Sequence, residues 1–190
     1  GVMTDPDPDA DRTQAARDQI QETIARSDTF DILHYAIHLD LTSVQAAAFK
    51  AHTTITFTSL LAGQQHIRLD LLQLTVDSVV GTSGTLDYAY DGQYLDIQSE
   101  APFEVGSEHA ITVYYHGTPH RDSEWGGFYY EGSYIYNLGI GLSTVPPNFG
   151  KVWYPCFDSF VERATYTYHV KSTGTFRAHC QGDFLGAAQL

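Results

Sequence analysis

Apolar and polar side chains alternate along many short stretches of this chain. In the first stretch, Ile32–Thr42, apolar side chains occupy every second position: Leu33, Tyr35, Ile37, Leu39 and Leu41. The positions between them carry smaller or polar side chains: His34, Ala36, His38 and Asp40. A period of two residues is typical of a β-strand that buries one face. The pattern therefore predicts a strand at Ile32–Thr42 whose odd-numbered residues face the core.

The same alternation predicts further strands along the rest of the chain. They are expected at Phe49–Phe57, Ile67–Leu71, Leu74–Val80 and Ala110–His116. Together with the hairpins described next, they amount to about a dozen short strands without a long helix. This arrangement indicates an all-β fold: an antiparallel β-sandwich or saddle-like domain with a short N-terminal helix.

Turn residues predict how some of these strands are joined. Asp91-Gly92, between LDYAY and QYLDI, predicts a two-residue type I′ hairpin turn. A second hairpin is expected where Glu131-Gly132-Ser133 separates two tyrosine-rich stretches, Phe128–Tyr130 and Tyr134–Tyr136. A third would pair Ala164–Val170 with Thr175–Cys180 around Ser172-Thr173-Gly174. The stretch Gly139–Gly150 is expected to be a loop, because it contains two adjacent prolines.

The first 31 residues follow a different pattern. Gly1–Asp9 is rich in Pro and Asp, which is typical of a flexible lead-in. A short helix is predicted after it, capped by Asp9 or Asp11 and reaching Arg26. Its apolar residues recur at four-residue spacing, namely Ala16, Ile20 and Ile24. So narrow a stripe favours a linker helix, with a partner-binding helix as the alternative. The chain is thus divided into residues 1–31, the lead-in and helix, and residues 32–190, a β-domain.

Charge narrows the range of partners. The net charge of −13 argues against nucleic acid or an anionic membrane. Residues 1–31 contribute −5, from eight acids and three arginines, and the remainder contributes −8, so the acidity is spread over a solvated surface. No apolar run approaches the ~20 residues that a membrane-spanning helix needs.

The two cysteines, Cys156 and Cys180, leave the cellular compartment open. They are compatible with a disulfide in an oxidising compartment and equally with two buried free thiols. An extracytoplasmic location is the one favoured.

The stretch Trp153–Val170 carries the most specific motif. Pro155 prevents a helix from running through it, and Ala164–Val170 alternates as a strand does. The PCFD of residues 155–158, followed by Glu162–Tyr166, resembles the PCFDEP…KATF segment of the aminopeptidase N-like zinc metallopeptidases. Other matching pieces occur in the same order: HYAIHLDL, TTITF, IRLDLLQLTVDSV, LDYAYDGQYLDI, ITVYYHGTP and GGFYY. The resemblance runs from His34 to Gly182.

This resemblance implies that the chain is the non-catalytic N-terminal β-domain of a larger zinc aminopeptidase. The domain is then expected to have no peptidase activity alone and to pack on its own catalytic domain, which would hold the zinc. The loop Asn137–Lys151 would wall one side of the cleft that takes the peptide substrate.

In the resembled family, two Gln or Glu side chains in the loop before PCFD hold the amino terminus of the substrate. The matching positions here are Thr144 and Pro146, and neither supplies a carboxylate. The family's Ala-Arg pair is matched by Gly150-Lys151, and the Glu-Pro after PCFD by Ser159-Phe160. These departures leave two alternatives open: a peptidase that anchors its substrate differently, or a homologue that has lost the activity.

No motif for metal or nucleophilic catalysis is complete in the sequence. Zinc peptidases of this class need HExxH, which is absent, as is its inverted form. His34 and His38 are four residues apart, but on a strand this places them about 13 Å apart, so we interpret them as surface residues. His116, His120 and Glu124 form a looser cluster in which only adventitious metal binding is conceivable.

Two carboxylates close in sequence, Asp158 and Glu162, offer the pair that glycoside hydrolysis requires. The favoured interpretation is structural. Asp158 is expected to accept backbone N–H bonds in its own turn, and Glu162 to face solvent or pair with Arg163.

Aromatic residues suggest a competing function. A platform that stacks on sugar rings could be built from six of them: Trp125, Tyr129, Tyr130, Tyr134, Tyr136 and Trp153. The structural interpretation is that they are core residues or cross-strand partners. A third alternative is a purely structural module with a partner interface and no ligand.

Overall fold

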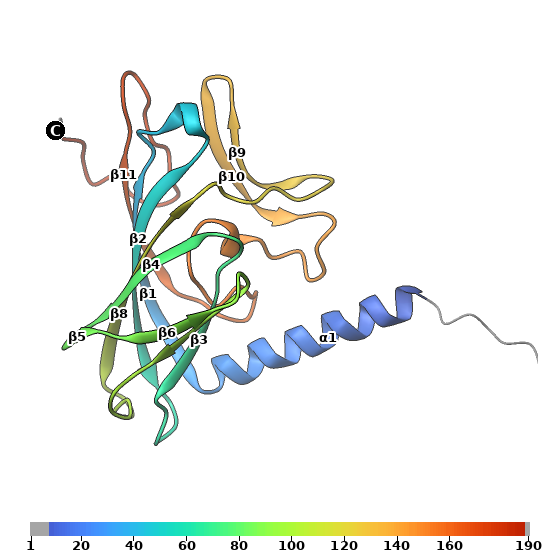
Figure 1. The fold of residues 1–190 in the computed structure, drawn as a ribbon, viewed down its shortest axis with the longest axis vertical. Helices are drawn as coiled ribbons and strands as arrows, with labels where there is room; N and C mark the ends of the chain where they lie inside the picture. Colours follow the sequence, from blue (N-terminus) through green and yellow to red (C-terminus); the bar gives the residue numbers. More distant parts are fainter. Residues whose placement is uncertain (1–7, 189–190) are drawn as a thin grey trace, which may run out of the picture.

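The computed structural model describes residues 8–188, which form one helix followed by eleven strands (Figure 1). The helix is α1 (Pro8–Ser27). The strands are β1 (Phe30–Asp40), β2 (Phe49–Ser59), β3 (His66–Asp70), β4 (Thr75–Gly81), β5 (Gly84–Thr85), β6 (Asp87–Tyr90), β7 (Tyr94–Gln98), β8 (Glu108–Gly117), β9 (Gly126–Glu131), β10 (Tyr134–Gly141) and β11 (Thr165–Lys171). Two short 3₁₀ helices complete the list: η1 (Val44–Ala46) and η2 (Gly150–Val152). The all-β fold with an N-terminal helix is therefore confirmed.

The strands form three sheets. The largest has six strands in the order β11-β1-β2-β8-β4-β5, and β3-β7-β6 and β10-β9 form the other two. Strand pairs are antiparallel except β1–β11, which is parallel. The hydrophobic core lies between the six-stranded and three-stranded sheets (Figure 1).

The inner face of the largest sheet follows the predicted alternation. In β2 and β8 the alternate side chains Ile55, Phe57, Ile111, Val113 and Tyr115 are buried. From the opposite sheet they meet Ile67, Leu69, Leu95 and Ile97. The strands predicted at Phe49–Phe57 and Ala110–His116 are thus confirmed, because a half-buried antiparallel strand shows its period directly in the sequence.

One residue of the first strand faces differently from the prediction. The register of β1 against β2 shifts between Ile32 and His34, which is a β-bulge. Phe30 and Ile32 therefore share the buried face with Tyr35, whereas Leu33 is only partly buried. The extra residue of the bulge reverses the alternation at this point.

The hairpin between β6 and β7 has its turn one residue later than predicted. Tyr90 pairs with Leu95, so the two central residues are Gly92 and Gln93. Gly92 has φ +93°, and Gln93 is not among the residues with positive φ, which fits a type II′ turn rather than type I′. The Asp91 carboxylate stays outside the turn centre and accepts the N–H groups of Gln93 (2.8 Å) and Tyr94 (2.7 Å).

The C-terminal hairpin is the one wrong strand pairing. Thr175–Cys180 is not a strand, and β11 instead pairs in parallel with β1, His34 opposite Thr165 through Asp40 opposite Lys171. The pairing has a packing reason, because Tyr166 of β11 stacks on buried Tyr35 of β1 with ring centroids 5.4 Å apart. A hairpin with Thr175–Cys180 offers no such core contact, since those residues are exposed.

Helix α1 begins at Pro8, so Asp9 and Asp11 lie in its first turns and not at the cap. The lead-in expected at Gly1–Asp9 lies, up to Asp7, outside the described residues. The helix ends at Ser27, one residue beyond the prediction, and its C-terminal end meets the body of the domain (Figure 1). Ala16 and Thr23 are buried, whereas Ile20 of the predicted stripe is exposed. No helix among the described residues is long and apolar enough to span a membrane.

The packing of the hydrophobic core can be tested by a substitution at Phe57. Its ring is fully buried and meets Phe30 and Phe103 edge-to-face, with centroids 5.6 and 5.2 Å away. Phe57→Ala should lower the free energy of unfolding by about 3–5 kcal/mol, because it leaves a cavity that the sheet cannot close. Urea unfolding measures the loss. Phe184→Ala is the matched control, since Phe184 is 81% exposed, and should change stability by less than about 0.5 kcal/mol. Equal effects of the two changes would contradict this core assignment.

Candidate functional site

The PCFD turn lies at the centre of the domain, against the end of β3. Asp70 donates its backbone N–H to the carbonyl of Cys156 (2.8 Å), and Cys156 donates back to the carbonyl of Asp70 (3.1 Å). The next backbone N–H, that of Phe157, donates to the hydroxyl of buried Tyr35 (3.1 Å). Burial raises the pKa of both the Cys156 thiol and the Tyr35 hydroxyl, so both groups stay neutral at ordinary pH.

The carboxylate of Asp70 joins this turn to helix α1. Its Oδ2 accepts the N–H of Asp158 (3.0 Å) and lies 3.0 Å from a guanidinium nitrogen of Arg26. A second guanidinium nitrogen donates to Oδ1 (3.2 Å), so the pair is bidentate. The side chains of Arg26 and Asp70 are only 11% and 3% exposed. The guanidinium also lies over the Phe157 ring, 5.3 Å from its centroid.

The two carboxylates after the turn serve separate backbone groups. Asp158 accepts the N–H of Gly150 (3.1 Å) and forms an ion pair with Lys151 (3.6 Å). Burial raises the pKa of Asp158, and the charge of Lys151 opposes that rise. Glu162 accepts the N–H of Ile32 (3.1 Å). The structural interpretation of this pair is confirmed, but the partners differ from the prediction: Asp158 bonds outside its own turn, and Glu162 bonds to β1.

A further carboxylate, that of Asp122, fixes the loop between β10 and η2. Asp122 accepts backbone N–H groups of Glu124 (3.0 Å), Trp125 (3.0 Å) and Ser143 (3.1 Å), and the Ser143 hydroxyl (2.6 Å). Partial desolvation works against ionisation, but these hydrogen bonds outweigh it and lower the pKa of Asp122 to about 2. The loop is therefore held by an ionised carboxylate at all ordinary pH values. The expected loop at Gly139–Gly150 starts later, because β10 continues to Gly141.

Two glycines of the GGFYY motif let the backbone of two neighbouring segments approach β9 closely. A Cβ on Gly126 would lie 2.0 Å from the carbonyl oxygen of Ile140, and a Cβ on Gly127 would lie 2.6 Å from that of His120. Both residues also have positive φ. The motif thus carries a backbone-to-backbone contact that only glycine permits.

The structure places Thr144 and Pro146 in this loop but in different surroundings. The Thr144 hydroxyl donates to the carbonyl of Gly141 (2.9 Å), within the loop itself. Pro146 instead lines a cavity of about 130 Å³ at the base of α1. The other lining residues come from three segments: Ile20, Thr23 and Ile24; Asn148; and Asp158, Ser159, Phe160 and Val161. The helix and the segment after PCFD meet here because the Arg26 guanidinium and the backbone N–H of Asp158 both bind the carboxylate of Asp70.

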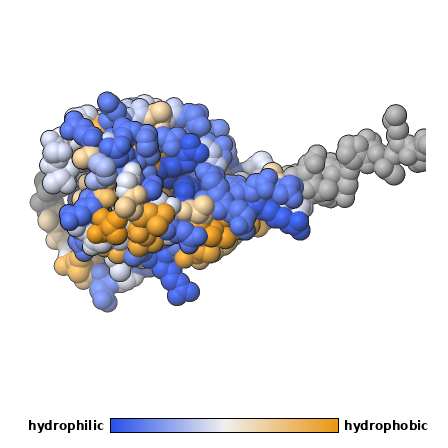
Figure 2. Space-filling model, turned by 90° about the horizontal axis from the view of Figure 1, so that it is seen from below, coloured by the Kyte–Doolittle hydropathy of each residue, from blue (hydrophilic) through white to orange (hydrophobic). Residues whose placement is uncertain are grey.

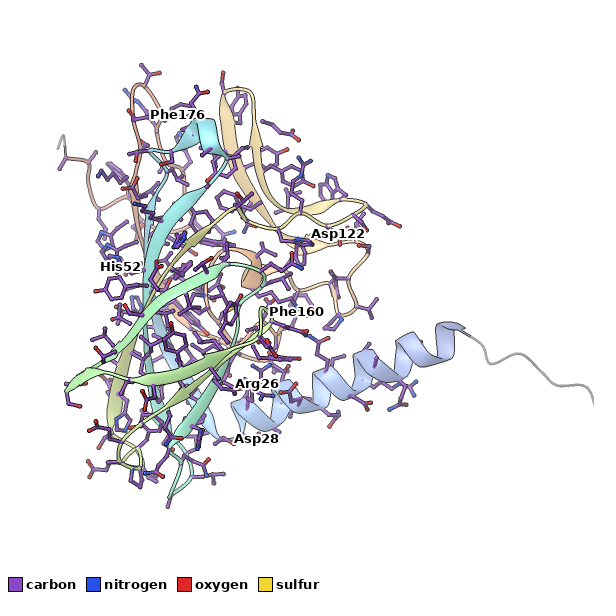
Figure 3. The ribbon with its side chains drawn as sticks, viewed as in Figure 1. Arg26, Asp28, His52, Asp122, Phe160 and Phe176 are labelled. Atoms are coloured by element: carbon purple, nitrogen blue, oxygen red, sulfur yellow. The ribbon has the colours of Figure 1, made fainter. Side chains whose placement is uncertain are left out.

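Apolar side chains are exposed around this cavity and along the adjoining loop. We call them the apolar face: Ile20, Trp125, Leu142, Val145, Phe160 and Val161. Their exposed fractions range from 43% for Ile20 to 72% for Phe160. Figure 2 shows hydrophobic residues gathered beside the base of α1, and Figure 3 shows Phe160 above Arg26 of the helix. An apolar cluster rimmed by polar residues is typical of a surface that packs on a partner.

The histidines proposed or rejected as ligands do not come together. His116 pairs with Asp77 (2.9 Å), and the ring of His120 lies against Phe149. His34 contacts Thr165 (2.7 Å) on the neighbouring strand. Within residues 8–188, no group of three or more potential ligands is arranged to hold a metal ion.

The six aromatic residues do not form one flat platform. Tyr129 is buried and stacks on Tyr136 at 4.9 Å, and Trp153 packs on Phe128 and Tyr154. They therefore serve mainly as cross-strand and core partners, and a sugar platform is not favoured. Both cysteines are free thiols, and Cys180 is exposed, which differs from the alternative of two buried thiols.

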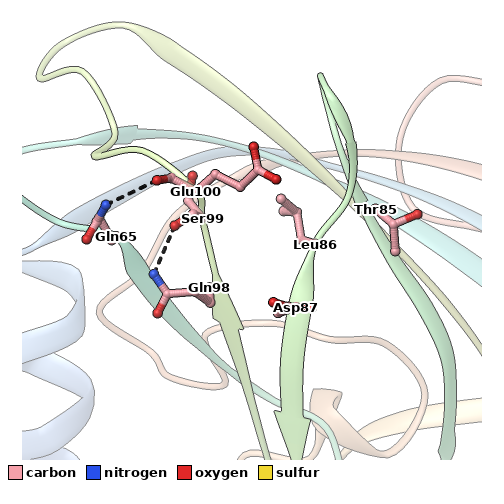
Figure 4. A pocket seen from close by; sticks show the side chains of 7 residues that line it. All are labelled: Gln65, Thr85, Leu86, Asp87, Gln98, Ser99 and Glu100. Atoms are coloured by element: carbon pink, nitrogen blue, oxygen red, sulfur yellow. Dashed lines mark hydrogen bonds between the residues drawn. The ribbon is translucent and has the colours of Figure 1, made fainter.

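A larger, polar cavity of about 370 Å³ lies elsewhere, between the β5–β6 region and the end of β7 (Figure 4). Its side chains are Gln65, Thr85, Leu86, Asp87, Gln98, Ser99 and Glu100. Gln65 donates to the carbonyl of Glu100 (3.4 Å), and Gln98 to that of Ser99 (2.9 Å). The two amides thus reinforce the end of the strand.

Comparisons with known proteins identify the fold. No protein-family model matches the sequence, and no curated protein matches it significantly. A variant of the M1 zinc metallopeptidase from Deinococcus radiodurans, bound to a Tyr-Ser-Ala substrate, matches with a TM-score of 0.66 and 22% identity over 76% of this chain and 33% of that chain. Leukotriene A4 hydrolase from Saccharomyces cerevisiae matches with a TM-score of 0.56 and 16% identity, over 76% of this chain and 23% of that chain. This chain therefore has the fold of one part of these proteins and spans at most about a third of their length.

The Arg26–Asp70 pair can be tested by removing one partner. Arg26→Met keeps the bulk of the side chain but leaves the Asp70 carboxylate buried without its cation, which should cost about 3–5 kcal/mol of unfolding free energy. Adding Asp70→Asn to Arg26→Met should recover much of this loss, because the amide oxygen still accepts the N–H of Asp158 and carries no charge.

The same substitution at an exposed ion pair is the control. Arg68 pairs with Asp96 at 2.7 Å, and both side chains are about two-fifths exposed, at 42% and 39%. Arg68→Met should cost less than about 1 kcal/mol. If Arg26→Met proved as mild as Arg68→Met in urea unfolding, the central role given to Asp70 would be wrong.

Proposed function

We propose that this chain is the N-terminal, non-catalytic domain of an aminopeptidase N-like zinc metallopeptidase. The observation that carries the proposal is the match in fold to the M1 zinc metallopeptidase. The sequence resemblance supports it independently, because its most specific piece, PCFD, is the turn that Asp70 holds at the centre of the fold. On this proposal residues 32–190 are the β-domain, and residues 1–31 precede it.

The domain packs on its catalytic domain through the apolar face. Phe160 and Val161 follow the PCFD turn after Ser159, and the hydrogen bond from Gly150 to the Asp158 side chain helps to fix their position. The loop that Asp122 holds contributes Leu142 and Val145 to the same face. Packing on the catalytic domain removes this apolar area from water, which stabilises the contact between the two domains.

The loop Asn137–Lys151 walls one side of the substrate cleft. Thr144 and Pro146 stand at the positions that would meet the amino terminus of a peptide. The hydroxyl of Thr144 donates to Gly141, and proline has neither a carboxylate nor an N–H, so these two side chains cannot hold an ammonium group by charge. The full enzyme must then anchor its substrate through groups of the catalytic domain.

Zinc belongs to that catalytic domain, where it would polarise the scissile carbonyl and activate water. The role of this domain is to shape the cleft, and it is expected to have no peptidase activity of its own.

The full-length protein provides the decisive test. It should contain one zinc ion per chain by metal analysis and should hydrolyse aminoacyl-arylamides, with both properties lost on chelation. Zinc without cleavage would point to a substrate that lacks a free amino terminus. A protein with neither zinc nor hydrolysis would contradict the proposal.

The apolar face can be tested in the same protein. Phe160→Asp should weaken the packing of the two domains by about 2 kcal/mol or more, because it places a charge in a desolvated contact. Calorimetry should then resolve two unfolding transitions in place of one. Phe184→Asp is the control, since Phe184 is as exposed as Phe160 but lies outside this face. A single unchanged transition in Phe160→Asp would show that another surface meets the catalytic domain.

A further inference from the structure

Three histidine rings stack across the outer face of the six-stranded sheet. His169 of β11, His38 of β1 and His52 of β2 occupy aligned positions on neighbouring strands. The His38 ring lies 4.1 Å from that of His169 and 4.2 Å from that of His52, with interplanar angles of 7° and 12°. Tyr114 of β8 continues the series at 5.2 Å from His52. We call these four side chains the imidazole row, and Figure 3 shows His52 on the side of the sheet away from Arg26 and Phe160.

Stacking at this distance suits neutral rings. One protonated ring between neutral neighbours remains acceptable, since a cation is attracted to an aromatic face. A second proton on an adjacent ring places two positive charges about 4 Å apart, where the repulsion is strong even near the surface. The ring planes are parallel, so the rings present their edges to solvent, and the row offers no flat face to a sugar.

The charged groups around the row do not neutralise the positive charge that protonation adds to it. The aligned positions next to it, towards the strand ends, hold Lys171, Asp40, Lys50 and His116. Asp40 already pairs with Lys171 (3.4 Å), and Asp77 of β4 already pairs with His116 (2.9 Å). On the other side the aligned positions are uncharged: Thr167, Ala36, Thr54 and Thr112. His34 lies two positions further along β1 and contacts Thr165.

The imidazole row spans the pairing between β11 and β1, with His169 opposite His38. This strand is at the edge of the sheet, and no strand among the described residues pairs with its other side. Its ladder joins it to β1 alone, whereas β1, β2 and β8 each have neighbours on both sides. An edge strand opens more readily than a central one, so repulsion within the row acts first on β11.

We propose that protonation of the imidazole row undocks β11 from β1 at mildly acidic pH, so that the C-terminal edge of the sheet opens while the rest of the domain stays folded. The proposal does not depend on the aminopeptidase assignment. It makes the chain segment that follows β11 mobile in acid and ordered at neutral pH.

The direction in which the pKa values of His38 and His52 are shifted agrees with this proposal. Burial, His52 and His169 lower the pKa of His38 below 6.5, and burial and His169 lower that of His52. A histidine with a lowered pKa binds its proton less well in the folded state than in the opened state. The stabilisation of the docked strand is therefore complete above pH 6.5 and is lost as the pH falls through the lowered values.

Hydrogen exchange on the full-length protein tests this device. Protection factors, corrected for intrinsic exchange, are measured for β11 and β8 at pH 7.5 and pH 5. Those of β11 should fall by about tenfold or more, the change expected for one extra proton in the opened state per pH unit. Those of β8 should stay within about twofold.

Two variants separate the row from other effects of acid. His38→Phe and His169→Phe each keep a stacked ring but remove one imidazole from the row, and each should leave β11 protected at pH 5. His66→Phe, at an exposed position of β3, is the control and should behave as the unmodified protein does. The proposal is overturned if β11 stays protected at pH 5 in the unmodified protein, or if both row variants lose protection as it does.

Discussion

The buried carboxylate of Asp70 is the interaction on which the arrangement of this domain depends. One side chain at the end of β3 binds the guanidinium of Arg26 and the backbone N–H of Asp158, and the backbone of the same residue pairs with Cys156. Helix, sheet and PCFD turn are thereby joined at a single point. A buried ion of this kind does not add much stability by itself, but leaving one partner alone is costly. The arrangement therefore selects one position for the helix over the alternatives.

One part of the apolar face depends on this junction at Asp70. The turn that Asp70 holds places Asp158 against Gly150 and Lys151, and so fixes the start of η2. The residues after the turn, Phe160 and Val161, are then directed to solvent beside α1. The loop before η2 is held separately by Asp122. The carboxylates of Asp158 and Asp122 both accept backbone N–H groups and so hold these two segments in place. The outermost side chains of the rigid surface that the segments form are apolar.

The sequence predicts local features of this fold well and distant pairings poorly. The strands β1, β2 and β8 could be located because each buries one face and shows a period of two. The bulge at Leu33 and the turn at Gly92-Gln93 depend on the register of a partner strand, which no local pattern carries. The parallel pairing of β11 with β1 joins residues 131 positions apart, such as His34 and Thr165.

The same reason limits what could be predicted at the site. That Asp158 and Glu162 are structural followed from their setting in a turn, but their partners, Gly150 and Ile32, could not be found from spacing. Arg26 was visible only as the end of a helix. Of the stacked histidines the sequence predicts only His38 as a surface residue, because its alignment with His52 and His169 exists only once β2 and β11 lie beside β1.

The parallel pairing has a mechanical consequence. The chain enters β1 at Phe30 and leaves β11 at Lys171, which lies beside Asp40 at the opposite end of the paired strands. A force that pulls the two ends of the chain apart is directed along the strands, in opposite senses, and perpendicular to the hydrogen bonds that join them. All the bonds of the ladder then bear the load together, in shear, and none can open before its neighbours as in a zipper. The domain should therefore resist unfolding most strongly when tension is applied through the chain segments on either side of it.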